Sequence, residues 1–583
     1  MADLGASVGR DDRYVVSNVL DVEASLSRGL RIGGRIGLVL AALACILPAV
    51  LVIVGSLSDG SVFSNFKLSF APWQRALDSP QSIDALKYSL LLTLRNPVGL
   101  FVAFVIAWYL ARHDVFGKRV VMGTLWLAFF LPILPATLGW IVLLDPNYGV
   151  LNKLAQLLFG VAPFNVYSLL GISWIHLTLT TVPIMVLLIE PAQRFIDYAY
   201  EEASAVSGAA TWTTLRRITV PLLAPTLLTV FIAGVIRSLE SFEVEQLLGV
   251  PAGLPVYSTR IFNLLNMAPA DEPQAMALST LFLLILLILV VCYRMFLERA
   301  RIAATVTGKG GKFFARPRTL TSNVISALLF VLIAIIVLLP FSMVVLSSFS
   351  KLFGFFDIPS PWTLAHWKDV LWSPTFLAAL RQSLVIGLTV AIVGTVIYLC
   401  LAWAIARSTF KGRSALSLAI WLPWALPGVL LGMAYLTVFL NVPVLRIVYG
   451  TSLTLIVVLL VQGLPLATHM FEASTSQVSR ELEEASLISG AGEAETVCRI
   501  TVPIIAPMIA SVFIISLMTS IKDIGATVLL ATPGSQTLPL IMFGYATSGR
   551  LEAASVVGVI TVLIALVMAL VVLRLGEQRT IGR

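Results

Sequence analysis

Two stretches of the sequence repeat each other and decide how the rest of the chain is organised. Residues 201–225 read EEASAVSGAATWTTLRRITVPLLAP, and residues 483–507 read EEASLISGAGEAETVCRITVPIIAP. Aligned without gaps at an offset of 282 residues, they agree at 15 of 25 positions. The agreement falls on polar and turn-forming residues, which an apolar composition alone does not produce. The repeat therefore predicts two equivalent halves, each with one copy of the same hydrophilic loop.

The composition around this repeat is that of a membrane protein. The chain has 583 residues, of which 58% are hydrophobic and 12% charged, whereas soluble domains have about 25% charged residues. Apolar runs long enough to cross a bilayer as helices begin near residues 36, 86, 120, 168, 222, 275, 322, 382, 414, 452, 505 and 553. Because lipid offers no hydrogen-bond partner to open backbone, we expect an all-α polytopic membrane protein with twelve transmembrane helices in two pseudo-symmetric six-helix halves.

Polar segments divide the chain and indicate its orientation. The predicted parts are a cytoplasmic N-terminal segment 1–35, a first transmembrane domain 36–297, a basic cytoplasmic linker 298–321, a second transmembrane domain 322–576 and a cytoplasmic tail 577–583. Arg and Lys also cluster in the turns that would share one side with the linker, as the positive-inside rule requires. This topology explains the net charge of +8 without a nucleic-acid partner. The first apolar run is too long for a cleaved signal peptide.

The repeated loop has the features of a short helix-turn-helix on the inner face of the membrane. Acidic residues at its start favour a helix N-terminus, and Gly208 and Gly490 allow a sharp turn. Pro221 and Pro503 stand where the next helix begins, the position at which a missing amide hydrogen costs least. The small residues between these points leave a shallow surface for a partner protein.

These loops resemble the EAA motif of the permeases of binding-protein-dependent ABC importers. The motif residues at the required spacing are Glu202, Ala203, Gly208, Ile218 and Pro221 in the first copy and Glu484, Ala485, Gly490, Ile500 and Pro503 in the second. Both copies depart from the motif in the same two ways, with Ser204 and Ser486 for the second alanine and Val220 and Val502 for leucine. Glu201 and Glu483 precede the motif in each copy.

The resemblance implies a type I-like ABC importer permease in the bacterial inner membrane, multi-pass, with both termini cytoplasmic. Each loop would be a coupling helix that docks on one of two copies of a cytoplasmic ABC ATPase subunit, and a periplasmic solute-binding protein would deliver the solute. The chain has no phosphate-binding loop, because residues 306–312 (VTGKGGK) lack the required spacing. We therefore expect ATP and Mg²⁺ to bind the partner subunits, with no cofactor and no enzyme activity in this chain.

Within this family the chain looks most similar to fused ferric-iron permeases. The supporting segments are residues 238–243 (SLESFE), 253–262 (GLPVYSTRIF) and 521–530 (IKDIGATVLL). The resemblance implies ferric iron as the solute, with thiamine, polyamine or aminoethylphosphonate as alternatives.

Ionisable residues inside the predicted spans are candidates for the solute path. Glu240 and Glu243, spaced i and i+3, are predicted to share a face in the outer half of the fifth span, and Lys522 and Asp523 occupy the equivalent place in the second half. The acids could receive a cation, contact basic residues of a periplasmic partner or close a salt bridge between the halves. Arg95 in the second span would pair with Glu240 or Glu243, or meet an anionic group of the solute.

Two other classes of protein remain as alternatives at this point. An ion-coupled secondary transporter also uses repeated halves, but it would need carboxylates at mid-membrane and no matched cytoplasmic loops. A membrane-embedded enzyme would need a clustered nucleophile, base or metal-ligand set. The four histidines and four cysteines are scattered singly, so neither a metal site nor a disulfide is expected.

Overall fold

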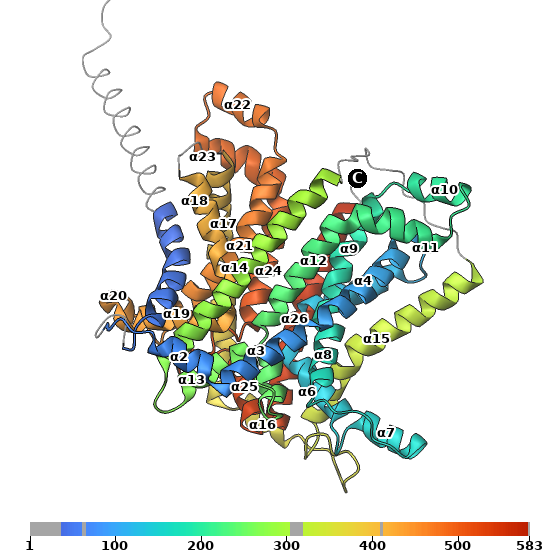
Figure 1. Cartoon of the computed structure of the whole chain (residues 1–583), viewed down its shortest axis with the longest axis vertical. Coiled ribbons are helices and arrows are strands. Elements are labelled where there is room, and N and C mark those ends of the chain that lie inside the picture. The colour runs from blue at the N-terminus through green and yellow to red at the C-terminus, as the bar shows by residue number, and fades with distance from the viewer. Residues whose placement is uncertain (1–36, 61–65, 304–318, 408–411, 581–583) are drawn as a thin grey trace, which may run out of the picture.

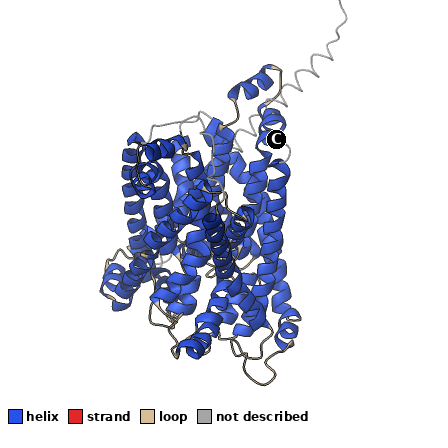
Figure 2. Ribbon diagram, turned by 90° about the vertical axis from the view of Figure 1, so that its right-hand side faces the viewer, coloured by secondary structure: helices blue, strands red, loops and turns tan. Residues whose placement is uncertain are grey.

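The computed structural model describes residues 37–60, 66–303, 319–407 and 412–580, and these form a bundle of helices (Figure 1). The extended pairings within these ranges are two isolated bridges, Ser58 to Leu68 and Ser350 to Trp362, and Figure 2 draws the described chain as helices and loops. The predicted all-α fold is confirmed. The N-terminal segment 1–35 and most of the linker 298–321 lie outside the described residues.

The described residues of the first half contain six membrane spans. In chain order they are Gly37–Ser56; α3 (Pro80–Thr93) with α4 (Arg95–Arg112); α5 (Lys118–Phe130) with α6 (Ile133–Leu144); α8 (Leu169–His176), the π-helical turn η1 (Leu177–Thr181) and α9 (Val182–Phe195); α11 (Thr211–Thr214), η2 (Leu215–Thr219) and α12 (Val220–Glu240); and α14 (Glu272–Ala303). Their apolar stretches are long enough to cross a bilayer.

The second half repeats this order. Its spans are α15 (Leu320–Ser348); α17 (Pro374–Arg407); α18 (Arg413–Trp421) and η4 (Leu422–Ala425) with α19 (Gly428–Asn441); α21 (Ser452–Ser476); α23 (Glu493–Thr496), η5 (Val497–Thr501) and α24 (Val502–Lys522); and α26 (Leu551–Thr580). Ten spans of the described chain are continuous and two are bent pairs. The twelve predicted spans are therefore present when each bent pair is counted as one.

The third span is broken in both halves. α5 and α6 meet at 105°, and α18 with η4 meets α19 at 109°. Pro132 and Pro427 stand directly before α6 and α19, and a proline ends the preceding helix because it lacks an amide hydrogen and clashes with the turn before it. The apolar runs near residues 120 and 414 predict the two spans but not this bend.

The first span of each half packs against the other half. The Tyr435 hydroxyl on α19 donates to the Ala44 carbonyl in the first span at 2.7 Å, and Cys45 is buried in the apolar cluster of the second half. Conversely, α15 packs on α5 and α6, and the Tyr109 hydroxyl donates to the Ser322 carbonyl at 2.8 Å. The two halves are thus interlocked by an exchange of their first helices.

Short helices gather at the two ends of the bundle. Figure 1 places α10 (Ala199–Val206) and α22 (Arg480–Ile488) at one end, together with the C-terminal end of α26. At the opposite end are α2 (Ala71–Asp78), α7 (Val150–Phe159), α13 (Tyr257–Asn266), α16 (Ala365–Leu371), α20 (Pro443–Arg446) and α25 (Leu538–Thr547). Both copies of the repeated loop therefore lie on the same side of the molecule, as the repeat predicts.

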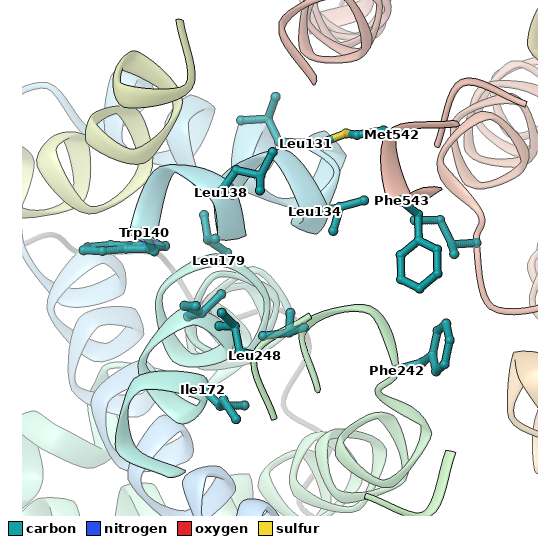
Figure 3. Close-up of a cluster of buried hydrophobic side chains, with 14 of the residues drawn as sticks. Leu131, Leu134, Leu138, Trp140, Ile172, Leu179, Phe242, Leu248, Met542 and Phe543 are labelled. Carbon is teal, nitrogen blue, oxygen red and sulfur yellow. The ribbon is translucent and has the colours of Figure 1, made fainter. Parts of the chain in front are cut away.

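An apolar seam also joins the two halves near the ends of their fifth spans. Figure 3 shows Leu131 and Leu134 of the first half opposite Met542 and Phe543 of α25, and all four side chains are buried. The Phe242 ring, in the segment after α12, lies 5.7 Å from the Phe543 ring, measured between centroids. This seam is where the ends of the fifth spans meet, and it positions the charged residues described below.

Candidate functional site

The repeated loop folds as predicted in both halves. The short helices α10 and α22 are each followed by a serine and then by a glycine that forms the turn. The φ angles of these glycines, Gly208 and Gly490, are +81° and +91°. Residues with a Cβ are strained in this left-handed conformation, and glycine adopts it freely. The space around both glycines is open, since an added Cβ would meet nothing within 4 Å. The glycines are thus required by the turn and not by close packing.

The two serines that depart from the motif have a structural partner. Ser204 and Thr214 share a hydrogen bond of 2.8 Å between their hydroxyls, and Ser486 and Thr496 share one of 2.9 Å. Each bond ties the short helix to the segment that leads into the fifth span. An alanine at this position could not make this bond, which explains why serine replaces the second alanine of the motif in both copies. The Ser and Thr ten residues apart in each copy are the feature of the sequence that could have predicted this bond.

An ion pair anchors each loop to the second span of its own half. The Arg112 guanidinium donates from Nε to Glu201 Oε1 at 2.9 Å, and Arg407 Nε lies 3.0 Å from Glu483 Oε2. Both arginines also bond main-chain carbonyls at the foot of the loop, including Ile196 in the first half. Each arginine is the last residue of span two, so the same clamp occurs twice.

Burial makes this clamp stronger than an ordinary surface ion pair. The side chains of Arg112 and Glu201 are 2% and 6% exposed, and removing one partner of a buried pair costs about 3–5 kcal/mol. By contrast, Arg499 and Glu495 form an exposed pair in the second loop, and such pairs contribute about 0–1 kcal/mol. In the sequence, Arg112 and Arg407 belong to the basic turns that indicate only the orientation of the chain. Their matching positions at the ends of the two second spans are the feature of the sequence that could have predicted a shared structural role.

The remaining motif residues present an outer face. Glu202, Ala203, Glu484 and Ala485 are exposed, as are Pro221 and Pro503 at the starts of α12 and α24. Ile218 and Ile500 are half-buried. Val206 and Ile488, at matching positions near the tips, are 89% and 87% exposed. Each loop thus shows an apolar tip next to acidic residues, while its other acid is held inside by the clamp.

The structure corrects the predicted partner of Arg95. Its Nη1 lies 3.7 Å from Glu245 Oε1, and the same oxygen is 2.9 Å from His176 Nε2. The Ser241 hydroxyl donates to this oxygen at 2.7 Å. The prediction that Arg95 pairs with Glu240 or Glu243 is therefore wrong, because α12 ends at Glu240 and the turn that follows carries Glu245 inward.

The predicted shared face of Glu240 and Glu243 is wrong for the same reason. Ser241 has an extended backbone at the end of α12, so the two acids do not stand on one helix. Glu240 instead lies 3.2 Å from Arg237, one turn earlier on α12. Glu243 lines a small cavity at the seam of the halves.

This seam cavity brings residues of both halves together. It has a volume of about 10 Å³, room for one water molecule, and Glu243 and Lys522 line it together with Pro132 and Pro135 at the bend of span three. Lys522 Nζ donates to the Phe129 carbonyl at 3.0 Å, at the end of α5. A cation is favourable at this place because the last carbonyls of a helix carry negative partial charge. Asp523, in contrast, accepts from the Ala526 amide within its own turn.

Metal-binding clusters are absent from the described part of the chain. Among its residues there is no group of three or more histidine, cysteine, aspartate or glutamate side chains placed to hold an ion. The four cysteines, all within the described residues, are free thiols. The site therefore consists of the two loops with their clamps and the charged seam between the halves.

The family of the chain follows from a comparison with known families. A family model described as a binding-protein-dependent transport system inner membrane component matches residues 96–302 and 397–581. The chain belongs to this family. The two matched segments fall in the two halves, and each includes one copy of the repeated loop. This inner membrane component is thus a fused permease with two family domains in one chain.

Two similar ferric transport permeases match this chain over most of its length, and a third relative matches less than half of it. It is 24% identical to the putative ferric transport system permease protein FbpB 1 of Haemophilus influenzae, over 85% of this chain and 78% of the relative. It is 24% identical to the ferric transport system permease protein FbpB of Actinobacillus pleuropneumoniae, over 90% of this chain and 75% of the relative. A putative 2-aminoethylphosphonate transport system permease protein, PhnV of Salmonella paratyphi A, is 25% identical over 44% of this chain and 94% of its own.

Among solved structures, one similar chain comes from a bacterial ABC transporter involved in the import of the acidic polysaccharide alginate. It is 20% identical, has a TM-score of 0.36, and the match covers 40% of this chain and 84% of that chain.

Proposed function

We propose that this permease forms the translocation path of an ABC importer for ferric iron, which a periplasmic binding protein delivers. The observation that supports this function most strongly is the pair of matched loops at one end of the bundle. Each loop is held to span two by an ion pair and leads into span five. Membership of the binding-protein-dependent family supports a binding-protein partner. The loops with their apolar tips and exposed acids supply two equivalent docking surfaces, one for each of two ATPase subunits that bind ATP and Mg²⁺.

The clamps suggest how ATPase motion reaches the path. Arg112 and Arg407 are the last residues of the second spans, and each binds a glutamate of the short helix in its half. A docked ATPase that moves the short helix therefore also pulls on span two. After the glycine turn, α11 or α23 continues without a break through η2 or η5 into α12 or α24. The hydroxyl bonds of Ser204 to Thr214 and of Ser486 to Thr496 join the short helix to this segment, so span five moves with the loop. Two spans in each half would thus follow one coupling helix.

The seam supports an inward-facing arrangement of this path. The outer ends of α12 and α24 converge where Glu243 and Lys522 line a cavity of about 10 Å³, too small for a solute. Elsewhere these two helices are the least covered of the ten continuous spans, with 17% and 22% of their apolar windows buried. α12 and α24 thus converge at their outer ends, while most of their apolar surface is not buried by other helices. This arrangement fits a path that is open toward the coupling loops.

Ferric iron is supported by the two ferric transport relatives and by acidic side chains near the seam, which do not form a metal-binding cluster but would attract a passing cation. Hard cations bind carboxylate oxygens, and Glu240, Glu243 and Asp523 lie at the ends of the two fifth spans. 2-Aminoethylphosphonate is a second candidate, because the amine and phosphonate groups would suit a path with acids next to Lys522 and Arg237, and because a permease of that name is similar.

Calorimetry separates the two solutes. The binding protein encoded next to this permease is purified and titrated with ferric iron and with 2-aminoethylphosphonate, and the loaded protein is then tested for stimulation of ATP hydrolysis by the complete transporter. Ferric iron is expected to bind and to stimulate. Binding and stimulation by the phosphonate alone would overturn the iron assignment and leave the importer assignment intact.

A further inference from the structure

α7 is an amphipathic helix outside the spans. It follows the bent third span of the first half, and each successive residue turns by about 100° around its axis. Asn152 and Ala155 are buried against the protein. A second side carries exposed leucines, and a third carries the polar Lys153 and Gln156. We call the exposed leucines the α7 stripe, which consists of Leu154, Leu157 and Leu158.

Polar contacts hold this helix in a fixed orientation. The Asn152 amide donates to the carbonyls of Asp145 and Phe164, at 2.9 and 2.8 Å, and its oxygen accepts from the Phe164 amide at 2.9 Å. Lys153 donates to both carboxylate oxygens of Asp357, at 2.8 and 2.9 Å. The stripe is therefore displayed by a braced helix and not by a frayed loop.

The exposure of the stripe requires a partner. Leu157 is 82% exposed and its neighbour Leu158 is 63% exposed, and contiguous apolar surface of this kind marks a protein or membrane contact. The nearest charge on the helix, Lys153, is already paired with Asp357. The surface thus fits an apolar partner better than a charged one. Leu170, at the start of the following span helix α8, is 84% exposed as well.

The second half has a counterpart that helps to identify the partner. α20 follows the bent third span of that half, and Val444 and Ile447 on and beside it are 74% and 83% exposed. Figure 1 shows α7 and α20 on opposite flanks of the molecule, at the end that lies away from α10 and α22. A soluble protein docked over the seam would meet elements between these flanks, whereas a bilayer surrounds both flanks at once.

We propose that α7 lies in the interface of the outer leaflet, with its leucine stripe in the boundary between headgroups and acyl chains and Lys153 and Gln156 toward water. α20 anchors the opposite flank in the same way. Helices with one apolar and one polar side bind the interface in this orientation. Because each adjoins a bent third span, they hold the outer ends of α6 and α19 at a fixed depth while the coupling loops move.

Spin labels on two sides of α7 test this proposal. The full chain, with its four native cysteines replaced by alanine, carries a single nitroxide on Leu157→Cys or on the matched control Gln156→Cys, and is reconstituted in lipid nanodiscs. The label at 157 is expected to collide several times more often with oxygen, which enters lipid, than with a water-soluble nickel chelate, and the label at 156 is expected to show the reverse. Equal access of the nickel chelate to both labels would overturn the proposal.

Two further measurements keep the test decisive. If the label at 157 loses nickel access only after loaded binding protein is added, the stripe is a docking surface for that protein and the membrane proposal is wrong. If the cysteine variants do not fold, hydroxyl-radical labelling of the unmodified chain replaces them. In nanodiscs, Leu157 is expected to be oxidised several times less than Val206 of the first coupling loop, which is exposed to a similar degree (82% and 89%), and equal oxidation would contradict the proposal.

Discussion

Loss of the buried clamp in the first half should loosen α10 from the bundle. In Glu201→Gln, the side chain keeps its shape and one neutral acceptor, but Arg112 loses the charge that offsets its burial. Breaking a buried ion pair costs about 3–5 kcal/mol. We expect the lower value, about 3 kcal/mol, because Arg112 keeps its bonds to the Ile196 carbonyl. Since about 1.4 kcal/mol is a factor of ten, the loosened form of α10 becomes roughly 100 times more populated.

Hydrogen exchange measures this loosening directly. Amides of α10 should exchange roughly 100-fold faster in Glu201→Gln, while those of α22 should be unchanged. The matched control is Glu495→Gln, which breaks the exposed pair with Arg499 in the second loop and should change exchange by less than about fivefold, because exposed pairs contribute at most about 1 kcal/mol. Replacing both clamp partners with methionine should recover much of the loss. Exchange of α10 that is no faster than in the control would refute the clamp.

Three other outcomes follow from the same geometry. Gly208→Arg should leave the permease in the membrane but weaken its hold on one ATPase subunit severalfold in a pull-down, because the left-handed turn disfavours a side chain; normal pull-down and transport would contradict it. A cysteine at Ser360 should react with an impermeant thiol reagent on intact cells and one at Ala210 should not, and the reverse pattern would break the proposed orientation. Glu245→Gln should lower the amount of folded protein because it leaves Arg95 unpaired, and adding Arg95→Leu should restore it; immunoblots that show no loss would refute this pairing.

The number of spans and the division into two halves could be predicted from the sequence because the signals for both are local. Each apolar run is long enough to name a span by itself, and the copies at 201–225 and 483–507 give the two halves without any knowledge of contacts. The turn at Gly208 and Gly490 was equally readable, since a glycine at the same point of two repeated loops points to backbone geometry.

The missed features depend on contacts between distant segments. Glu240 and Glu243 were expected to share a face because both were counted along a helix that in fact ends at Glu240. The acid that meets Arg95 is instead Glu245, which also contacts His176 from another span. Nothing in a run of apolar residues distinguishes a proline that bends a span, such as Pro132, from one that a membrane helix tolerates, such as Pro225 inside α12. The exchange of the first spans is likewise a packing choice, decided by surfaces such as Tyr435 on Ala44.

Uptake by the complete transporter in proteoliposomes distinguishes an ATP-driven importer from a secondary transporter. The permease is reconstituted with its ATPase subunits, with ATP and Mg²⁺ inside and binding protein loaded with radioactive ferric iron outside. We expect iron to accumulate inside the liposomes only when both ATP and the binding protein are present, and we expect this uptake to be abolished when the ATPase is omitted. Uptake that proceeds without ATP, driven by an ion gradient alone, would contradict this expectation and would identify a secondary transporter.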